Sequence, residues 1–110
     1  MDSFPQKGEF IFVSFDPARG HEQQGRRPAL VVSSNYLNKS GMVWAVPITH
    51  TLKGPGRIVI PTGEDVDGAV LFTQIKMLDI RERGYDGAGF ASDALLDEVV
   101  SKCAAILMED

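Results

Sequence analysis

The chain has 110 residues, of which 44% are hydrophobic and 24% are charged. This length allows one domain with a single hydrophobic core, and the near-average composition excludes a disordered chain. No segment approaches the roughly 18 consecutive apolar residues of a membrane-spanning helix, and the amino terminus lacks the basic and apolar regions of a signal peptide. We therefore expect one soluble, cytoplasmic domain over residues 1–110.

Acidic and basic residues are distributed unevenly along the chain. The formal net charge is −4, which argues against a general nucleic-acid coat, because such binding depends on neutralising phosphates with Lys and Arg. Residues 17–62, however, hold six basic residues and one acid, a net of +5, whereas residues 63–110 hold four bases and eleven acids, a net of −7. The first segment can therefore present a locally positive face to a polyanion.

Five short segments rich in β-branched and aromatic residues are predicted to be strands. They are residues 9–15, 29–34, 41–48, 57–61 and 69–75. Between the second and third, residues 33–40 have room for one helical turn, capped by Ser33 or Ser34. Two connections, 16–28 and 49–57, are long for hairpin loops, and long loops held on a small rigid sheet often carry function.

The carboxyl-terminal segment has the pattern of an amphipathic helix. Ser92 suits the N-cap, and Asp93 and Asp97 lie near the positive end of the helix dipole. Apolar residues recur at intervals of three and four and form one stripe, which we expect to pack on the sheet. The stripe consists of Leu95, Leu96, Val99, Val100, Cys103, Ile106 and Leu107. The predicted fold class is therefore mainly β with α (α+β), a small curved antiparallel sheet with this helix packed across it.

The first long connection contains the sequence GHEQQGRRP at residues 20–28. Pro28 biases Arg27 towards an extended backbone, and the planar donor fork of Arg27 suits a phosphate or a carboxylate. Two interpretations follow. Glu22 and an arginine can pair and brace the loop, or Glu22 can take a proton from a ribose 2′-hydroxyl while a guanidinium neutralises charge on the phosphate. His21 is a second candidate acid or base, although an isolated loop histidine is more often a bystander.

Neither a metal nor an organic cofactor is expected. His21 and His50 are the only histidines, and Cys103 is the only cysteine. This composition excludes an internal disulfide and the common zinc spacings, and leaves packing as the expected role of Cys103. The sequence also lacks a glycine-rich phosphate loop and a serine-nucleophile motif.

The segments FDPARGHEQQGRRPALVVSS, AVPITHTLK and TQIKMLDIRERG, in this order, resemble the MazF/PemK family of toxin endoribonucleases from toxin–antitoxin modules. The similarity extends from about residue 8 to the terminal helix. It implies a Src-homology-3-like antiparallel barrel that acts as a homodimer. It also implies sequence-specific, metal-independent cleavage of single-stranded RNA, leaving 2′,3′-cyclic phosphate and 5′-hydroxyl ends. Cutting mRNA in this way would inhibit translation and growth.

Roles carry over from this resemblance by position. Glu22 matches the family's general base, Arg27 the arginine that stabilises the phosphorane and serves as acid, and Thr49 a threonine that hydrogen-bonds the scissile phosphate. Further substrate-binding candidates are His21, Gln23, Arg26 and Gln74. For the two glutamines, bracing of the loops is an equal alternative, and Arg26 is expected to add phosphate affinity.

The chain departs from one branch of the family. That branch assigns catalysis to an acid before the glutamine of the third motif, with a histidine that matches His21 and an arginine two residues before the acid. Here the acid is replaced by Thr73 and the arginine by Leu71. The resemblance therefore favours Glu22 with Arg27 as the catalytic pair.

The resemblance also implies protein partners. An antitoxin tail would cover the RNA groove, and the toxin–antitoxin complex would bind operator DNA. Phe15 and Trp44 are candidates to anchor such a tail or stack a base, and for Trp44 burial in the core is the alternative. Two rival functions stay open at this point: a non-catalytic toxin of the same fold that binds a protein such as DNA gyrase, and a peptide-binding barrel.

Overall fold

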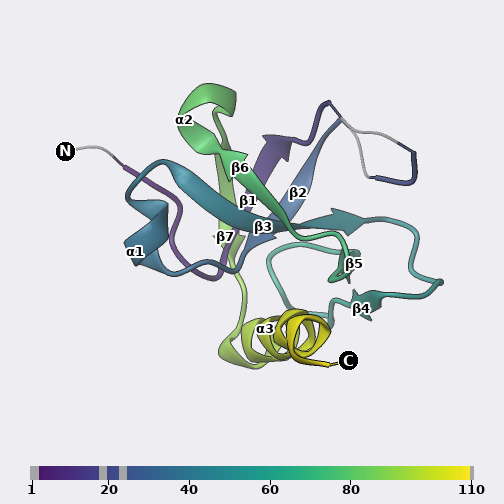
Figure 1. The fold of residues 1–110 in the computed structure, drawn as a ribbon. Helices are drawn as coiled ribbons and strands as arrows, with labels where there is room; N and C mark the ends of the chain where they lie inside the picture. The colour runs from purple at the N-terminus through teal and green to yellow at the C-terminus, as the bar shows by residue number, and fades with distance from the viewer. Residues whose placement is uncertain (1–2, 18–19, 23–24, 110) are drawn as a thin grey trace.

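A computed structural model describes residues 3–17, 20–22 and 25–109 of the chain (Figure 1). The strands are β1 (Glu9–Ser14), β2 (Arg26–Val31), β3 (Met42–Thr49), β4 (Arg57–Val59), β5 (Ala69–Leu71), β6 (Lys76–Asp79) and β7 (Asp86–Phe90). The helices are α1 (Asn35–Asn38), α2 (Ile80–Arg83) and α3 (Asp93–Met108). Within these described residues, no helix has the length and apolarity that crossing a membrane would require.

Strand β3 is the centre of an antiparallel sheet. Along one side it pairs with β2, with residues 29–31 opposite 45–47. Along the other side its first half pairs with β6 and its last two residues pair with β5. The order β4-β5-β3-β2-β1-β7, with β6 also on β3, makes a seven-stranded sheet within the described chain. Because all these pairs are antiparallel, the predicted sheet type is confirmed.

The sheet is curved, and both of its faces are buried over β1, β2 and β3. One cluster includes Phe10, Leu30 and Val46, and a second includes Ile11 and Ala29. Neighbouring residues along a strand point to opposite faces, so the two clusters lie on opposite sides of the same strands. This explains why these strands read as nearly continuous apolar runs. We call the face that carries Ile11 and Ala29 the inner face, and the face that packs against α3 the outer face.

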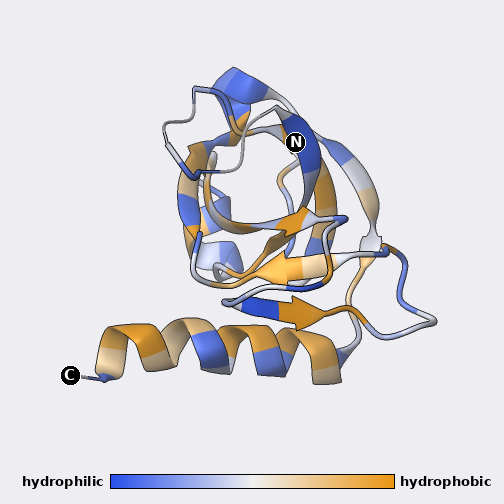
Figure 2. Ribbon diagram, turned by 90° about the vertical axis from the view of Figure 1, so that its right-hand side faces the viewer, coloured by the Kyte–Doolittle hydropathy of each residue, from blue (hydrophilic) through white to orange (hydrophobic). Residues whose placement is uncertain are grey.

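Helix α3 lies across the outer face (Figure 2). Its N-cap is Ser92, whose hydroxyl accepts a hydrogen bond from the Leu95 amide at 3.2 Å, as the sequence predicts. Leu95 and Val99 are buried in the outer cluster. The carboxyl end of the helix projects past the sheet, and Leu107 is 78% exposed. The predicted stripe therefore packs on the sheet only over the first part of the helix.

Several predicted boundaries were wrong. Strand β2 begins at Arg26 rather than at residue 29, because Arg26 and Arg27 pair with β1. The strand predicted at 69–75 ends at Leu71, and the short elements β6, α2 and β7 follow it, none of which the sequence predicted. The helical turn near residue 35 does form as α1, with Ser34 at its N-cap position but without a side-chain capping bond.

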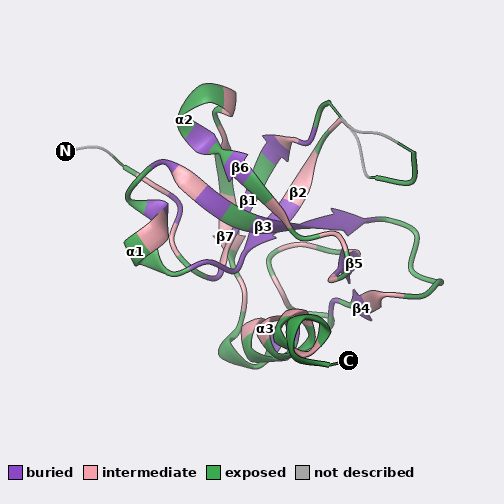
Figure 3. Ribbon diagram, in the orientation of Figure 1, coloured by how far each residue is buried: buried purple, intermediate pink, exposed green. Residues whose placement is uncertain are grey.

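The two aromatic candidates, Phe15 and Trp44, differ in burial. Phe15 is buried in the inner cluster, so the prediction that it anchors a tail or stacks a base is wrong, because its ring is not accessible. Trp44 is 41% exposed, so the core alternative is wrong for this residue. Trp44 alternates with the inner-face residues Val43 and Ala45, and it pairs with Met77, which is also exposed. Figure 3 shows the mixed burial of this part of β3 and β6.

Candidate active site

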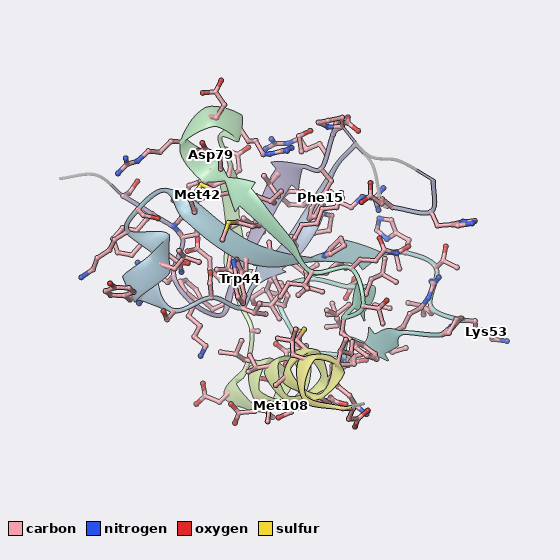
Figure 4. The ribbon with its side chains drawn as sticks, in the orientation of Figure 1. Phe15, Met42, Trp44, Lys53, Asp79 and Met108 are labelled. Atoms are coloured by element: carbon pink, nitrogen blue, oxygen red, sulfur yellow. The ribbon has the colours of Figure 1, made fainter. Side chains whose placement is uncertain are left out.

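Two long connections lie on the same side of the molecule, at the right in Figure 1. One joins β1 to β2 and contains Glu22; the other joins β3 to β4 and contains Lys53, whose side chain points away from the sheet in Figure 4. Since β2 and β3 are antiparallel neighbours, the first residues of β2 adjoin the last residues of β3. The sequence motifs around Arg27 and Thr49 therefore lie together at one end of these two neighbouring strands.

Arg27 lies on the inner face at this end of the strands. It pairs with Val13 of β1 and alternates with Ala29 along β2, and both of these residues belong to the inner cluster. Its side chain is half-buried. The guanidinium group therefore extends from a rigid strand at the end of the inner cluster, not from a loop as the sequence predicted.

Arg26, the neighbouring residue, points to the opposite face. It pairs with Ser14 of β1 and forms an ion pair with Asp86 of β7. The side chains of the pair are 50% and 75% exposed. Adjacent arginines in the motif are therefore separated by the strand, and Arg26 lies across the sheet from Arg27.

Thr49 ends β3 on the inner face, because it alternates with Ala45 along the strand. It is buried, and its hydroxyl accepts a hydrogen bond from the Thr51 amide at 3.2 Å. The backbone of Thr51 in turn accepts a hydrogen bond from Arg57 of β4. Thr49 therefore also fixes the beginning of the second long connection.

Glu22 belongs to the first long connection and is exposed. Its carboxylate Oε2 lies 3.3 Å from Nζ of Lys76, the first residue of β6. Lys76 pairs with Ala45 and alternates with Leu78, and both of these residues belong to the inner cluster. Arg27, Thr49 and the partner of Glu22 thus all lie on the inner face.

The base of this connection is closed by hydrogen bonds to the backbone of Gly25. The Phe15 amide donates to the Gly25 carbonyl at 3.0 Å, and the Gly25 amide donates to the Asp16 carboxylate at 2.9 Å. Gly25 has φ +80°, a conformation that favours glycine. Arg83 of α2 also donates to the Ser14 carbonyl at 2.8 Å. The turn that enters β2, and so the direction of Arg27, is therefore well determined.

The remaining candidates differ in placement. His21 is exposed beside Glu22. Gln74 is half-buried in the turn after β5, where its backbone N–H donates to the Leu71 carbonyl at 2.9 Å. Thr73, which replaces the acid of the other branch, is exposed. Gln23 lies outside the described residues. Within those residues, no group of three or more His, Cys, Asp or Glu side chains is arranged to hold a metal ion.

Lys76 is the site residue that sequence reasoning missed. It stands in the third motif, TQIKMLDIRERG, as the first residue of the unpredicted strand β6. The motif gave a signal for it, but the pairing of β6 with β3 is needed to bring Lys76 beside a loop 54 residues earlier in the chain.

A second feature is an apolar groove of about 490 Å³ between the outer face and α3. Its lining includes Trp44, Phe72, Met77, Cys103, Ile106 and Leu107. Trp44 lies above α3 in Figure 4. Cys103 packs against the outer cluster, as expected, and burial raises the pKa of its thiol.

Comparisons with known proteins agree with this architecture. Residues 6–107 match the family described as PemK-like, MazF-like toxin of type II toxin–antitoxin system. The chain is 38% identical over 104 residues, 94% of each chain, to the endoribonuclease toxin MazF of Escherichia coli K12. It is 38% identical over 108 residues, 93% of each chain, to the endoribonuclease toxin ChpB of the same organism.

Solved structures give the same result. A crystal structure of MazF from Deinococcus radiodurans has a TM-score of 0.88 and 36% identity, and covers 98% of this chain and 100% of its own. A MazE–MazF structure from the same organism has a TM-score of 0.83 and 36% identity, and covers 99% of this chain and 100% of its own.

Proposed function

Because the chain belongs to the PemK-like and MazF-like toxin family of type II toxin–antitoxin systems, we propose that it is an endoribonuclease toxin. It cuts single-stranded RNA, including mRNA, at short specific sequences, without a metal ion, and so stops translation and growth in the cytoplasm. The relatives MazF, ChpB and PemK all carry the name endoribonuclease, which favours this function over binding of a protein target such as DNA gyrase.

The proposed reaction is transesterification within the RNA. The Glu22 carboxylate accepts the proton of a ribose 2′-hydroxyl, and the 2′-oxygen attacks the adjacent phosphorus. The bond from phosphorus to the 5′-oxygen breaks, and that oxygen takes a proton, so the products are a 2′,3′-cyclic phosphate and a 5′-hydroxyl. Arg27 stabilises the charge on the phosphate oxygens and, as in the family, serves the leaving oxygen as acid. Thr49 hydrogen-bonds the phosphate.

One observation carries this assignment. Arg27 and Thr49 extend from adjacent strand ends onto the inner face, and Glu22 is paired with Lys76 on that same face. A base, a cation and a phosphate-binding hydroxyl around one region are what this reaction requires, since no covalent enzyme intermediate is needed. His21, beside Glu22, and Gln74 are proposed to contact the RNA.

The test is cleavage of a single-stranded RNA oligonucleotide by the purified protein in excess chelator. Mapping the 5′ ends of the fragments identifies the sequence that is cut. A second oligonucleotide then carries deoxyribose only at the nucleotide 5′ of the cut. We expect this single change to block cleavage, because the attacking hydroxyl is removed. Continued cleavage of the substituted oligonucleotide rules out the mechanism.

The same family membership supports two protein partners. Structures of MazE–MazF pair a related toxin with an antitoxin, and we propose a cognate antitoxin that covers the RNA site of this toxin. We also propose that the toxin is a homodimer. Light scattering of the toxin alone and with its co-purified antitoxin tests both, and a monomer at all concentrations contradicts the dimer.

A further inference from the structure

Lys76 is held firmly by the sheet, whereas the residue it contacts is not part of a strand. Lys76 begins β6 and pairs with Ala45 in the centre of β3. Its side chain is 24% exposed, and its ammonium group lies 3.3 Å from the Glu22 carboxylate. The Glu22 side chain is 44% exposed and belongs to the connection between β1 and β2.

The hydrogen bonds that close this connection lie at its two ends. They join Phe15 and Asp16 to Gly25, and Glu22 lies between these two points in the chain. A general base must lie within hydrogen-bond reach of the proton it removes. The contact with Lys76 connects the Glu22 carboxylate to the inner face, where Arg27 and Thr49 also lie.

We propose that Lys76 is a positioning residue that holds the Glu22 carboxylate towards the RNA. This inference rests on the proposed function, in which Glu22 is the base. An effect through Glu22 changes the rate of the chemical step and leaves RNA affinity nearly unchanged.

The first experiment compares Lys76→Met with Lys76→Arg in RNA cleavage under chelator. Methionine keeps an unbranched apolar side chain and removes the charge, whereas arginine keeps a cation. We expect Lys76→Met to lower kcat by about tenfold with little change in KM, because misplacement of a catalytic group slows the chemical step. Lys76→Arg should recover most of kcat. Lys102→Met, on the exposed face of α3, is the matched control.

The second experiment combines Lys76→Met with Glu22→Gln. If Lys76 acts through Glu22, the double variant cleaves at the rate of Glu22→Gln alone, so the two effects are not additive. If Lys76 instead binds an RNA phosphate directly, Lys76→Met raises KM both in the wild-type protein and in Glu22→Gln, and the two rate losses multiply. This result overturns the proposal. The melting temperature of each variant separates a folding defect from a catalytic one. Lys76→Gln, which also removes the positive charge, is a second variant for use if Lys76→Met does not fold.

The two assignments fail in different ways. If Glu22→Gln keeps wild-type activity, Glu22 is not the base, and the role proposed for Lys76 is wrong as well. If Glu22→Gln is inactive but Lys76→Met cleaves at the wild-type rate, only the role of Lys76 is wrong, and the proposed mechanism stands.

Discussion

The candidate site is supplied by two regions that are held in different ways. Arg27 and Thr49 extend from adjacent strands, so their positions follow from the register of β1, β2 and β3. Glu22 and His21 belong to the connection between β1 and β2, outside any strand or helix. The proposed phosphate-binding groups are thus part of the sheet, while the proposed base lies in a loop and contacts β6. This difference predicts that the two regions respond differently to substitution.

The largest effect is expected from the loop region. Glu22→Gln keeps the size of the side chain and removes its ability to accept a proton, so we expect kcat to fall by about 10²–10⁴, the usual contribution of a general base. The measurement is single-turnover cleavage of RNA in chelator. Since Glu22 is exposed, the melting temperature should change little. Unchanged cleavage would remove Glu22 from the mechanism.

A slightly smaller effect is expected from the strand region. Arg27→Ala removes the cation that stabilises the phosphate oxygens, and we expect a loss of about 10²–10³ in rate, as for one oxyanion donor. Arg27→Lys keeps the charge but not the planar fork, so it should recover only part of the activity. Wild-type activity in Arg27→Lys would show that a bidentate contact with the phosphate is not required.

Thr49 should matter less than either charged residue. Thr49→Ala removes a neutral hydroxyl, which contributes less than a charged group in the transition state. The same change also removes the acceptor for the Thr51 amide. Thr49→Ser keeps the hydroxyl and is the matched control. We expect a loss smaller than that of Arg27→Ala, mostly recovered in Thr49→Ser, measured by the same cleavage assay.

Much of the fold follows from local sequence patterns, and the failures have physical causes. The apolar runs of β1 and β3 and the periodic stripe of α3 identify these elements because burial determines their residues. Strand β7 has the sequence DGAGF, which lacks the usual strand residues. It forms through backbone pairing with β1. On Gly89, a side chain would meet the Asp65 carboxylate, so close approach explains the glycine there.

The sequence proposes candidates for the site but not their arrangement. The motif offers Glu22 and Arg27 as candidates, yet it places Arg27 in a loop, because two arginines before a proline do not resemble a strand. The sequence also leaves the burial of Trp44 open, since a tryptophan within an apolar run is usually buried, whereas the structure exposes this one. In both cases pairing between distant strands, which local periodicity does not encode, determines which face a residue occupies.

The smallest effect is expected at Arg26, and it tests the comparison most directly. Arg26 and Arg27 are adjacent and carry the same charge, but strand alternation places them on opposite faces. Arg26 is paired with Asp86, an exposed contact worth about 0–1 kcal/mol. Arg26→Ala should therefore leave kcat unchanged and at most weaken RNA binding slightly through the loss of one long-range positive charge.

The measurement is kcat and KM for Arg26→Ala beside Arg27→Ala, with Asp86→Asn as the control that frees Arg26 without removing it. If position relative to the sheet decides function, only the inner-face arginine is needed for the chemical step. A loss of kcat in Arg26→Ala as large as that in Arg27→Ala would mean that charge in this motif, and not the face of β2, governs cleavage.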